Sequence, residues 1–127
     1  MSAQDPYRER VMDHYKNPRN YGAMQKADAV AKEENLSCGD EVTFYLRAND
    51  DGTLRVQFTS ASCAICRASA SMLSELADGK MISEIAKLER SDVLCPFEGS
   101  LDRAREGCAL LPLVALKSAL SEFRKAD

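Results

Sequence analysis

Apolar and polar residues alternate over residues 41–48 and again over residues 54–59, which is the spacing of strands with one buried face. The residues between them at 49–52, Asn-Asp-Asp-Gly, are those of a tight hairpin turn. The apolar positions are Val42, Phe44, Leu46, Leu54, Val56 and Phe58. The pattern therefore predicts an antiparallel hairpin. Residues 27–35 are ambiguous and could form a short edge strand.

Elsewhere the apolar spacing changes to the three- and four-residue interval of amphipathic helices. Helices are predicted over residues 5–17, 66–77, 82–89 (with Ser83 as the cap) and from about Ala109 to Phe123. Residues 95–100 are predicted to form a loop. Early strands followed by helices predict an α+β fold, in which helices pack on one face of a small antiparallel sheet of about three strands.

Composition and charge narrow the class of protein. The chain of 127 residues is expected to form a single domain, 1–127, with 45% hydrophobic and 29% charged residues. A net charge of −3 provides no basic surface for nucleic acid, and no basic run indicates a membrane surface. No apolar run approaches the ~20 residues of a membrane span. The first residues contain no apolar segment of a secretory signal, so a cytoplasmic location is expected.

Three of the five cysteines have neighbours that differ from an apolar core pattern. Cys38 is followed by Gly39, Cys63 follows a serine, and Cys108 follows Gly107. Cysteines at such positions in a reducing compartment are more often metal-binding or catalytic than disulfide-bonded, although a free cysteine can also be a small apolar core residue. Glycine permits close backbone approach or unusual dihedral angles. Cys38 precedes the predicted hairpin and Cys63 follows it, so these two should be neighbours.

The local setting of these cysteines favours thiolate chemistry. Cys63 and Cys108 both precede predicted helices, whose free amides stabilise a thiolate, so both are candidate nucleophiles or ligands. Asp40, two residues after Cys38, adds an oxygen ligand. Three cysteines and one aspartate can complete a tetrahedral zinc site or hold an exchangeable iron–sulfur cluster.

Four segments in order resemble the U-type iron–sulfur assembly scaffolds, the family of IscU, SufU and the N-terminal domain of NifU. They are residues 7–22, the Cys-Gly-Asp at 38–40, the C-x-I-x-x-A-S-A-S-M run at 63–72, and the R-x-x-C at 105–108. The resemblance covers nearly the whole chain and is least between residues 80 and 104.

The resemblance implies a SufE/NifU-like α+β fold in which Cys38, Asp40, Cys63 and Cys108 bind a transient [2Fe–2S] cluster or Zn²⁺. It also implies two classes of partner, a cysteine desulfurase and apo iron–sulfur client proteins. By position Cys108 resembles the sulfur-accepting cysteine of the family, with Arg105 in support. The implied function is a scaffold rather than an enzyme.

The subtype is indicated by what precedes Cys108. IscU-type members carry a histidine there, after an L-P-P-V-K motif that binds a dedicated Hsp70 chaperone, whereas this chain has Gly107 and no such motif. No dedicated Hsp70 is therefore expected, and a SufU-like subtype is favoured. SufU-type members also carry an insertion between the second and third cysteines, which this chain lacks.

Other interpretations remain at the sequence level. The chain could be a zinc-dependent sulfurtransferase that relays persulfide sulfur without building a cluster, or a domain with a purely structural zinc. Cys66 forms C-x-x-C with Cys63 and could be a further ligand, a redox dithiol partner or a packed side chain. Cys95 matches nothing in the family, and the lone His14 is expected to be packed or solvated rather than a ligand.

Overall fold

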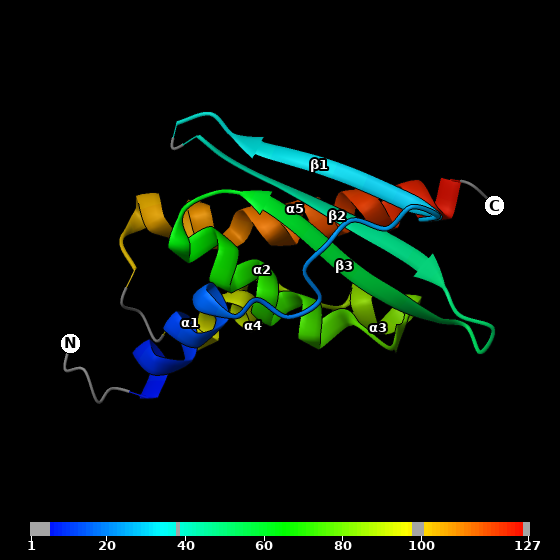
Figure 1. The fold of residues 1–127 in the computed structure, drawn as a ribbon, viewed down its shortest axis with the longest axis horizontal. Coiled ribbons are helices and arrows are strands. Elements are labelled where there is room, and N and C mark those ends of the chain that lie inside the picture. The colour runs from blue at the N-terminus through cyan, green and yellow to red at the C-terminus, as the bar shows by residue number, and fades with distance from the viewer. Residues whose placement is uncertain (1–5, 38, 98–100, 126–127) are drawn as a thin grey trace.

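The computed structural model describes residues 6–37, 39–97 and 101–125. The four strands form one antiparallel sheet in the order β1-β2-β3-β4. Helices α2 and α5 pack against the sheet, and Figure 1 shows the helices gathered on one side of it. The elements are α1 (Pro6–Lys16), β1 (Ala29–Asn35), β2 (Asp40–Ala48), β3 (Thr53–Ala61), α2 (Ala64–Ala77), β4 (Lys80–Met81), α3 (Ile82–Ala86), α4 (Arg90–Leu94), the 3-10 turn η1 (Cys95–Phe97) and α5 (Arg103–Lys125). The predicted α+β class is confirmed.

The predicted hairpin is formed by β2 and β3. Every apolar residue of its alternating pattern is buried, and Phe44 pairs with Phe58 at the centre, with the ring centroids 5.8 Å apart. At the turn, Gly52 has a φ of +88°, a conformation that favours glycine. Burial of each phenylalanine side chain stabilises the fold by about 1.5–3 kcal/mol. A register slip of one residue would expose this whole face, so the hydrophobic pattern fixes which ends of the strands meet.

The sheet has one strand more than the sequence pattern indicated. The ambiguous residues 27–35 contain β1, which lies at an edge and pairs with β2. On the other side, the two residues of β4 pair with the start of β3. Two residues are too few to show an alternation, so β4 could not be predicted from periodicity.

Two short helices also differ from the prediction. Helix α3 begins at Ile82 with Met81 at its cap position, and the side chain of Glu84 accepts the Met81 N–H at 3.1 Å, so Ser83 is not the cap. Helix α4 and the turn η1 occupy residues 90–97, where a loop had been predicted from residue 95; residues 98–100 lie outside the described part of the chain. A five-residue helix is too short to show a helical period.

Helix α5 begins at Arg103, well before the predicted start near Ala109. Asp102 accepts the N–H of Arg105 with its side chain at 2.9 Å, as a helix-capping residue does. The first turns of α5 are exposed and carry no apolar stripe, which is why their helical state was missed. Consequently Cys108 lies inside the helix and not in front of it.

A proline lies inside α5 one turn after Cys108. Pro112 is buried and has no N–H, so it cannot donate the usual helical hydrogen bond to the carbonyl of Cys108. Beside this point the hydroxyl of Ser69, on α2, donates to the carbonyl of Ala109 at 2.6 Å. A side-chain bond therefore connects α5 to α2 next to Cys108.

Helix α1 is attached to α2 through His14, which is buried. Its Nδ1 lies 2.7 Å from the hydroxyl of Ser71, and that hydroxyl accepts the backbone N–H of Arg19 at 2.9 Å. The Ser71 proton can then be donated to Nδ1, which leaves the ring proton on Nε2, 3.4 Å from Glu75. Burial lowers the pKa of His14, consistent with a neutral ring. His14 is thus packed, as expected. Among the described residues, no helix is both long and apolar enough to cross a membrane.

Candidate metal centre

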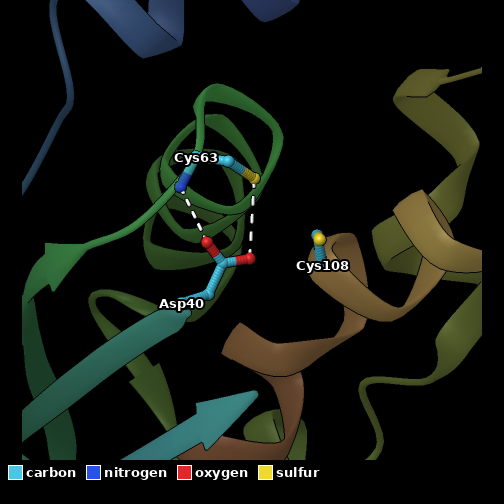
Figure 2. A group of neighbouring side chains, drawn as sticks. All are labelled: Asp40, Cys63 and Cys108. Carbon is cyan, nitrogen blue, oxygen red and sulfur yellow. Dashed lines mark hydrogen bonds between the residues drawn. The ribbon is translucent and has the colours of Figure 1, made fainter. Parts of the chain in front are cut away.

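Three side chains from distant parts of the sequence converge at one end of the sheet. One ligand atom each of Asp40, Cys63 and Cys108 lies within 4.8 Å of the other two. Figure 2 shows them approaching from the start of β2, the start of α2 and the early part of α5. Cys38, the other predicted ligand, lies outside the described residues. The structure thus brings together three of the four residues that the sequence singled out.

The carboxylate of Asp40 is held by the backbone of Cys63. Its Oδ1 accepts the Cys63 N–H at 2.8 Å, and its Oδ2 lies 3.5 Å from Cys63 Sγ, at hydrogen-bonding distance for a thiol (Figure 2). Asp40 is only 2% exposed. The pairing of Glu41 with Ala61 across the hairpin places these two chain segments side by side. One oxygen is therefore used to orient the carboxylate, while the other faces the sulfur.

Cys63 occupies the cap position of α2, so the prediction that it opens a helix is confirmed. Its backbone is extended, and its Sγ accepts the N–H of Cys66 at 3.5 Å. Cys63 is exposed, whereas Cys66 is fully buried. Within the described residues, the group of converging ligand atoms does not include Cys66.

The prediction that Cys108 precedes the last helix was wrong. The unpaired N–H groups of a helix belong to its first turn, here residues 103–106, and Cys108 comes after them. The dipole argument for its thiolate therefore does not hold. Cys108 is 6% exposed and packs in the core cluster with its sulfur toward the other two ligands.

The two glycines next to the predicted ligands have different roles. Gly39 has a φ of +70°, so an unusual backbone conformation is required there, as proposed from the sequence. Gly107 lies within α5, outside the left-handed region, and a Cβ atom added to it would lie 3.7 Å from Asn35 Nδ2, an ordinary contact. Close backbone approach therefore does not explain Gly107.

A cavity of about 580 Å³ opens beside the two sulfur-bearing residues. It is lined by Cys63 and Cys108 together with Ser37, Ile65 and Arg105. Arg105 is exposed and lies one helical turn before Cys108, so it supplies positive charge at this opening. A ligand that enters the cavity can reach both cysteines.

The donor set fits a borderline or soft metal. Two thiolates and a carboxylate suit zinc or iron, whereas magnesium and calcium prefer oxygen ligands throughout. With Zn–S bonds of about 2.3 Å, tetrahedral geometry puts two sulfur ligands about 3.8 Å apart. The observed separations of up to 4.8 Å would need to shorten by only a small side-chain movement.

The family model of the NifU-like N terminal domain matches residues 6–127. This chain belongs to that family. It is 37% identical over 120 residues to iron-sulfur cluster assembly scaffold protein IscU 1 of Archaeoglobus fulgidus, a match that covers 94% of this chain and 78% of the relative. It is 29% identical over 122 residues to the scaffold protein IscU of Haemophilus influenzae, covering 93% of this chain and 95% of the relative.

Solved structures of the NifU-like family share the fold. The crystal structure of a putative SUF-system scaffold, FiSufU of Fervidobacterium islandicum AW-1, is 29% identical, has a TM-score of 0.74, and covers 88% of this chain and 94% of that one. A NifU-like N-terminal protein of Brucella abortus, 20% identical, has a TM-score of 0.76 over 95% of this chain and 96% of that one, and supports the fold alone. The family resemblance is therefore confirmed. The similarity to FiSufU is compatible with the SufU-like subtype.

Proposed function

We propose that this chain is an iron–sulfur cluster assembly scaffold, which builds a transient [2Fe–2S] cluster as cargo and passes it to apoproteins. The observation that carries the proposal is the convergence of Asp40, Cys63 and Cys108 within 4.8 Å beside an open cavity. The chain also belongs to a family with similar proteins that are named as cluster assembly scaffolds.

Asp40 is suited to be the ligand that releases the cargo. A carboxylate oxygen is a weaker ligand for soft iron–sulfur centres than a thiolate. When the cluster leaves, Oδ2 can return to the Cys63 thiol, while the bond from the Cys63 N–H keeps the carboxylate in place throughout. The site can therefore open and close without a rearrangement of the hairpin.

In this proposal Cys108 and Arg105 handle the incoming sulfur, and Cys38 is a further ligand. Cys108 accepts sulfur as a persulfide from a cysteine desulfurase, and Arg105, at the opening of the same cavity, attracts the anionic persulfide. Cys38, placed by the sequence just before β2, completes the ligand set. A cytoplasmic location and the absence of a dedicated Hsp70 partner remain predictions from the sequence.

Anaerobic reconstitution with iron, cysteine and a desulfurase tests the scaffold role. We expect the visible absorption of a cluster and its transfer to an apo-ferredoxin. Asp40→Ala should slow that transfer, because the cluster then lacks the weakly bound ligand that is released first when the cargo leaves. Cys108→Ser should abolish sulfur uptake. Cys95→Ser is the matched control, because Cys95 is an exposed cysteine on η1, outside the ligand group.

The zinc-dependent sulfur relay gives a different result in the same experiment. In that case stoichiometric zinc persists, no cluster forms, and desulfurase turnover rises in a way that depends on Cys108. This result would favour the relay over the scaffold role. Faster loss of the cluster in Asp40→Ala than in the unmodified chain would contradict the role given to Asp40.

A further inference from the structure

Cys66 is a buried nucleophile that the scaffold role does not use. It is fully buried, three residues after the cap of α2, and its backbone N–H donates to Cys63 Sγ at 3.5 Å. Cys63 Sγ also lies within 4.8 Å of Cys108 Sγ. Cys63 thus accepts a hydrogen bond from the backbone of the buried Cys66 and lies near Cys108, which lines the same cavity as Cys63.

The local geometry suits a disulfide between Cys63 and Cys66. Residues three apart in a regular helix have Cα atoms about 5 Å apart, since each residue rises about 1.5 Å on a cylinder of about 2.3 Å radius. Disulfides span Cα separations of about 4.4–6.8 Å, so this spacing along the chain falls within the range of a disulfide. The C-x-x-C spacing at a helix start is also that of dithiol oxidoreductases.

We propose that Cys63 and Cys66 form a dithiol that reduces the sulfur delivered to Cys108 and releases it as sulfide. The inference rests on the proposed role of Cys108 as sulfur acceptor. It adds an activity to the scaffold, because persulfide sulfur must gain two electrons before it can enter a cluster as sulfide.

The reaction has two steps. The Cys63 sulfur attacks the Sγ of Cys108 persulfide, which forms a Cys63–Cys108 disulfide and expels the outer sulfur as hydrosulfide. The Cys66 sulfur then attacks Cys63 Sγ, which forms the Cys63–Cys66 disulfide and returns Cys108 as a thiol. Two thiols are oxidised and one sulfane sulfur is reduced, and the protons of the two thiols end on H2S and Cys108. A second turnover requires a dithiol reductant from solution.

Burial gives Cys66 its specificity. Because its side chain is inaccessible to solvent, an external persulfide or disulfide cannot reach it, and its neighbour Cys63 provides the route for exchange. By contrast, Cys95 is exposed on η1 and lies outside the ligand group of the described residues.

The experiment uses the full chain with Cys95→Ser as background, so that this exposed thiol does not react. The reduced, metal-free protein is treated anaerobically with inorganic polysulfide and desalted, and sulfide release and the disulfides are then measured by colorimetry and peptide mass mapping. We expect about one sulfide per chain without added reductant, and a Cys63–Cys66 disulfide. When Cys66→Ser is introduced into this background, the protein should still release sulfide, but the reaction should stop at a Cys63–Cys108 disulfide. When Cys63→Ser is introduced instead, the persulfide should remain on Cys108.

Different failures identify different errors. A persulfide that stays on Cys108 while Cys63 and Cys66 remain reduced overturns the dithiol and leaves the acceptor role intact. A Cys108 that takes up no sulfur contradicts the proposed function itself. A second measurement treats the Cys95→Ser, Cys108→Ser protein with oxidised glutathione. A mapped Cys63–Cys66 disulfide supports the dithiol, whereas a lasting glutathione adduct on Cys63, or a disulfide to Cys38, overturns it.

Discussion

The carboxylate of Asp40 should stabilise the metal-free fold as well as serve as a ligand, and two substitutions separate these roles. Asp40→Ala removes the buried acceptor of the Cys63 N–H at the start of α2. Asp40→Asn keeps an oxygen at the same place but removes the charge. A hydrogen bond to a charged group contributes about 1.5–3 kcal/mol, and one to a neutral group about 0.5–1.5 kcal/mol.

From these values we expect Asp40→Ala to lower the free energy of unfolding by about 2 kcal/mol, and Asp40→Asn by about 1 kcal/mol. The assay is urea unfolding of the reduced, metal-free protein. With a slope of about 2 kcal/mol per molar urea, the alanine variant should shift the midpoint by about 1 M and leave the slope unchanged.

Glu41→Ala is the control, since Glu41 is the next residue and its half-exposed side chain forms a surface ion pair with Lys32 at 3.2 Å. Such pairs contribute about 0–1 kcal/mol. Equal stability of Asp40→Ala and Asp40→Asn would refute the reasoning, because it would mean that the bond to the Cys63 N–H does not hold the site together.

Three further outcomes follow from the structure. Gly107→Ala should raise the free energy of unfolding by about 0.5–1 kcal/mol in a thermal or urea melt, because the added Cβ makes only an ordinary contact with Asn35; a loss of stability would contradict this. Ser69→Ala leaves the Ala109 carbonyl without its hydroxyl donor and should cost about 1–2 kcal/mol by the same assay, whereas an unchanged midpoint would show that this bond is dispensable. The pKa of His14 is lowered below 6.5 by burial, so the unfolded chain binds more protons and stability should fall as the pH drops below 6.5 toward the folded-state pKa. In urea melts against pH this slope should disappear in His14→Gln, and its persistence would assign it to other groups.

The half of the site that lies on the hairpin could be predicted from the sequence. Alternation over β2 and β3 fixes the register, and the register brings the start of one strand to the end of the other. For that reason Cys38 and Cys63 were expected to be neighbours. Cys38 lies outside the described residues, but Asp40, two residues after it, lies beside Cys63, with 2.8 Å between Asp40 Oδ1 and Cys63 N.

The position of Cys108 could not be derived from local pattern. It depends on how α5 packs across the helical side of the sheet, which is a long-range contact, and only the family resemblance pointed to it. Its setting within a helix was also missed, because the residues from Arg103 to Gly107 are mostly exposed and have no apolar periodicity. The capping residue Asp102, followed by Arg-Ala-Arg-Glu, was the signal that could have placed the helix start correctly.

Pro112 leaves α5 without one of its backbone hydrogen bonds, and we expect the parts of the helix before and after it to exchange with solvent at different rates. Since no hydrogen bond runs from Pro112 to the Cys108 carbonyl, the turns that carry Arg105 and Cys108 can open locally while the later turns stay packed under the sheet. We expect the free energy of such an opening to be smaller than that of global unfolding, although it would also break the contacts of Cys108 in the core cluster. Amide hydrogen exchange should therefore be faster before Pro112 than after it, and the sulfur-handling residue would belong to the more labile part of an otherwise continuous helix.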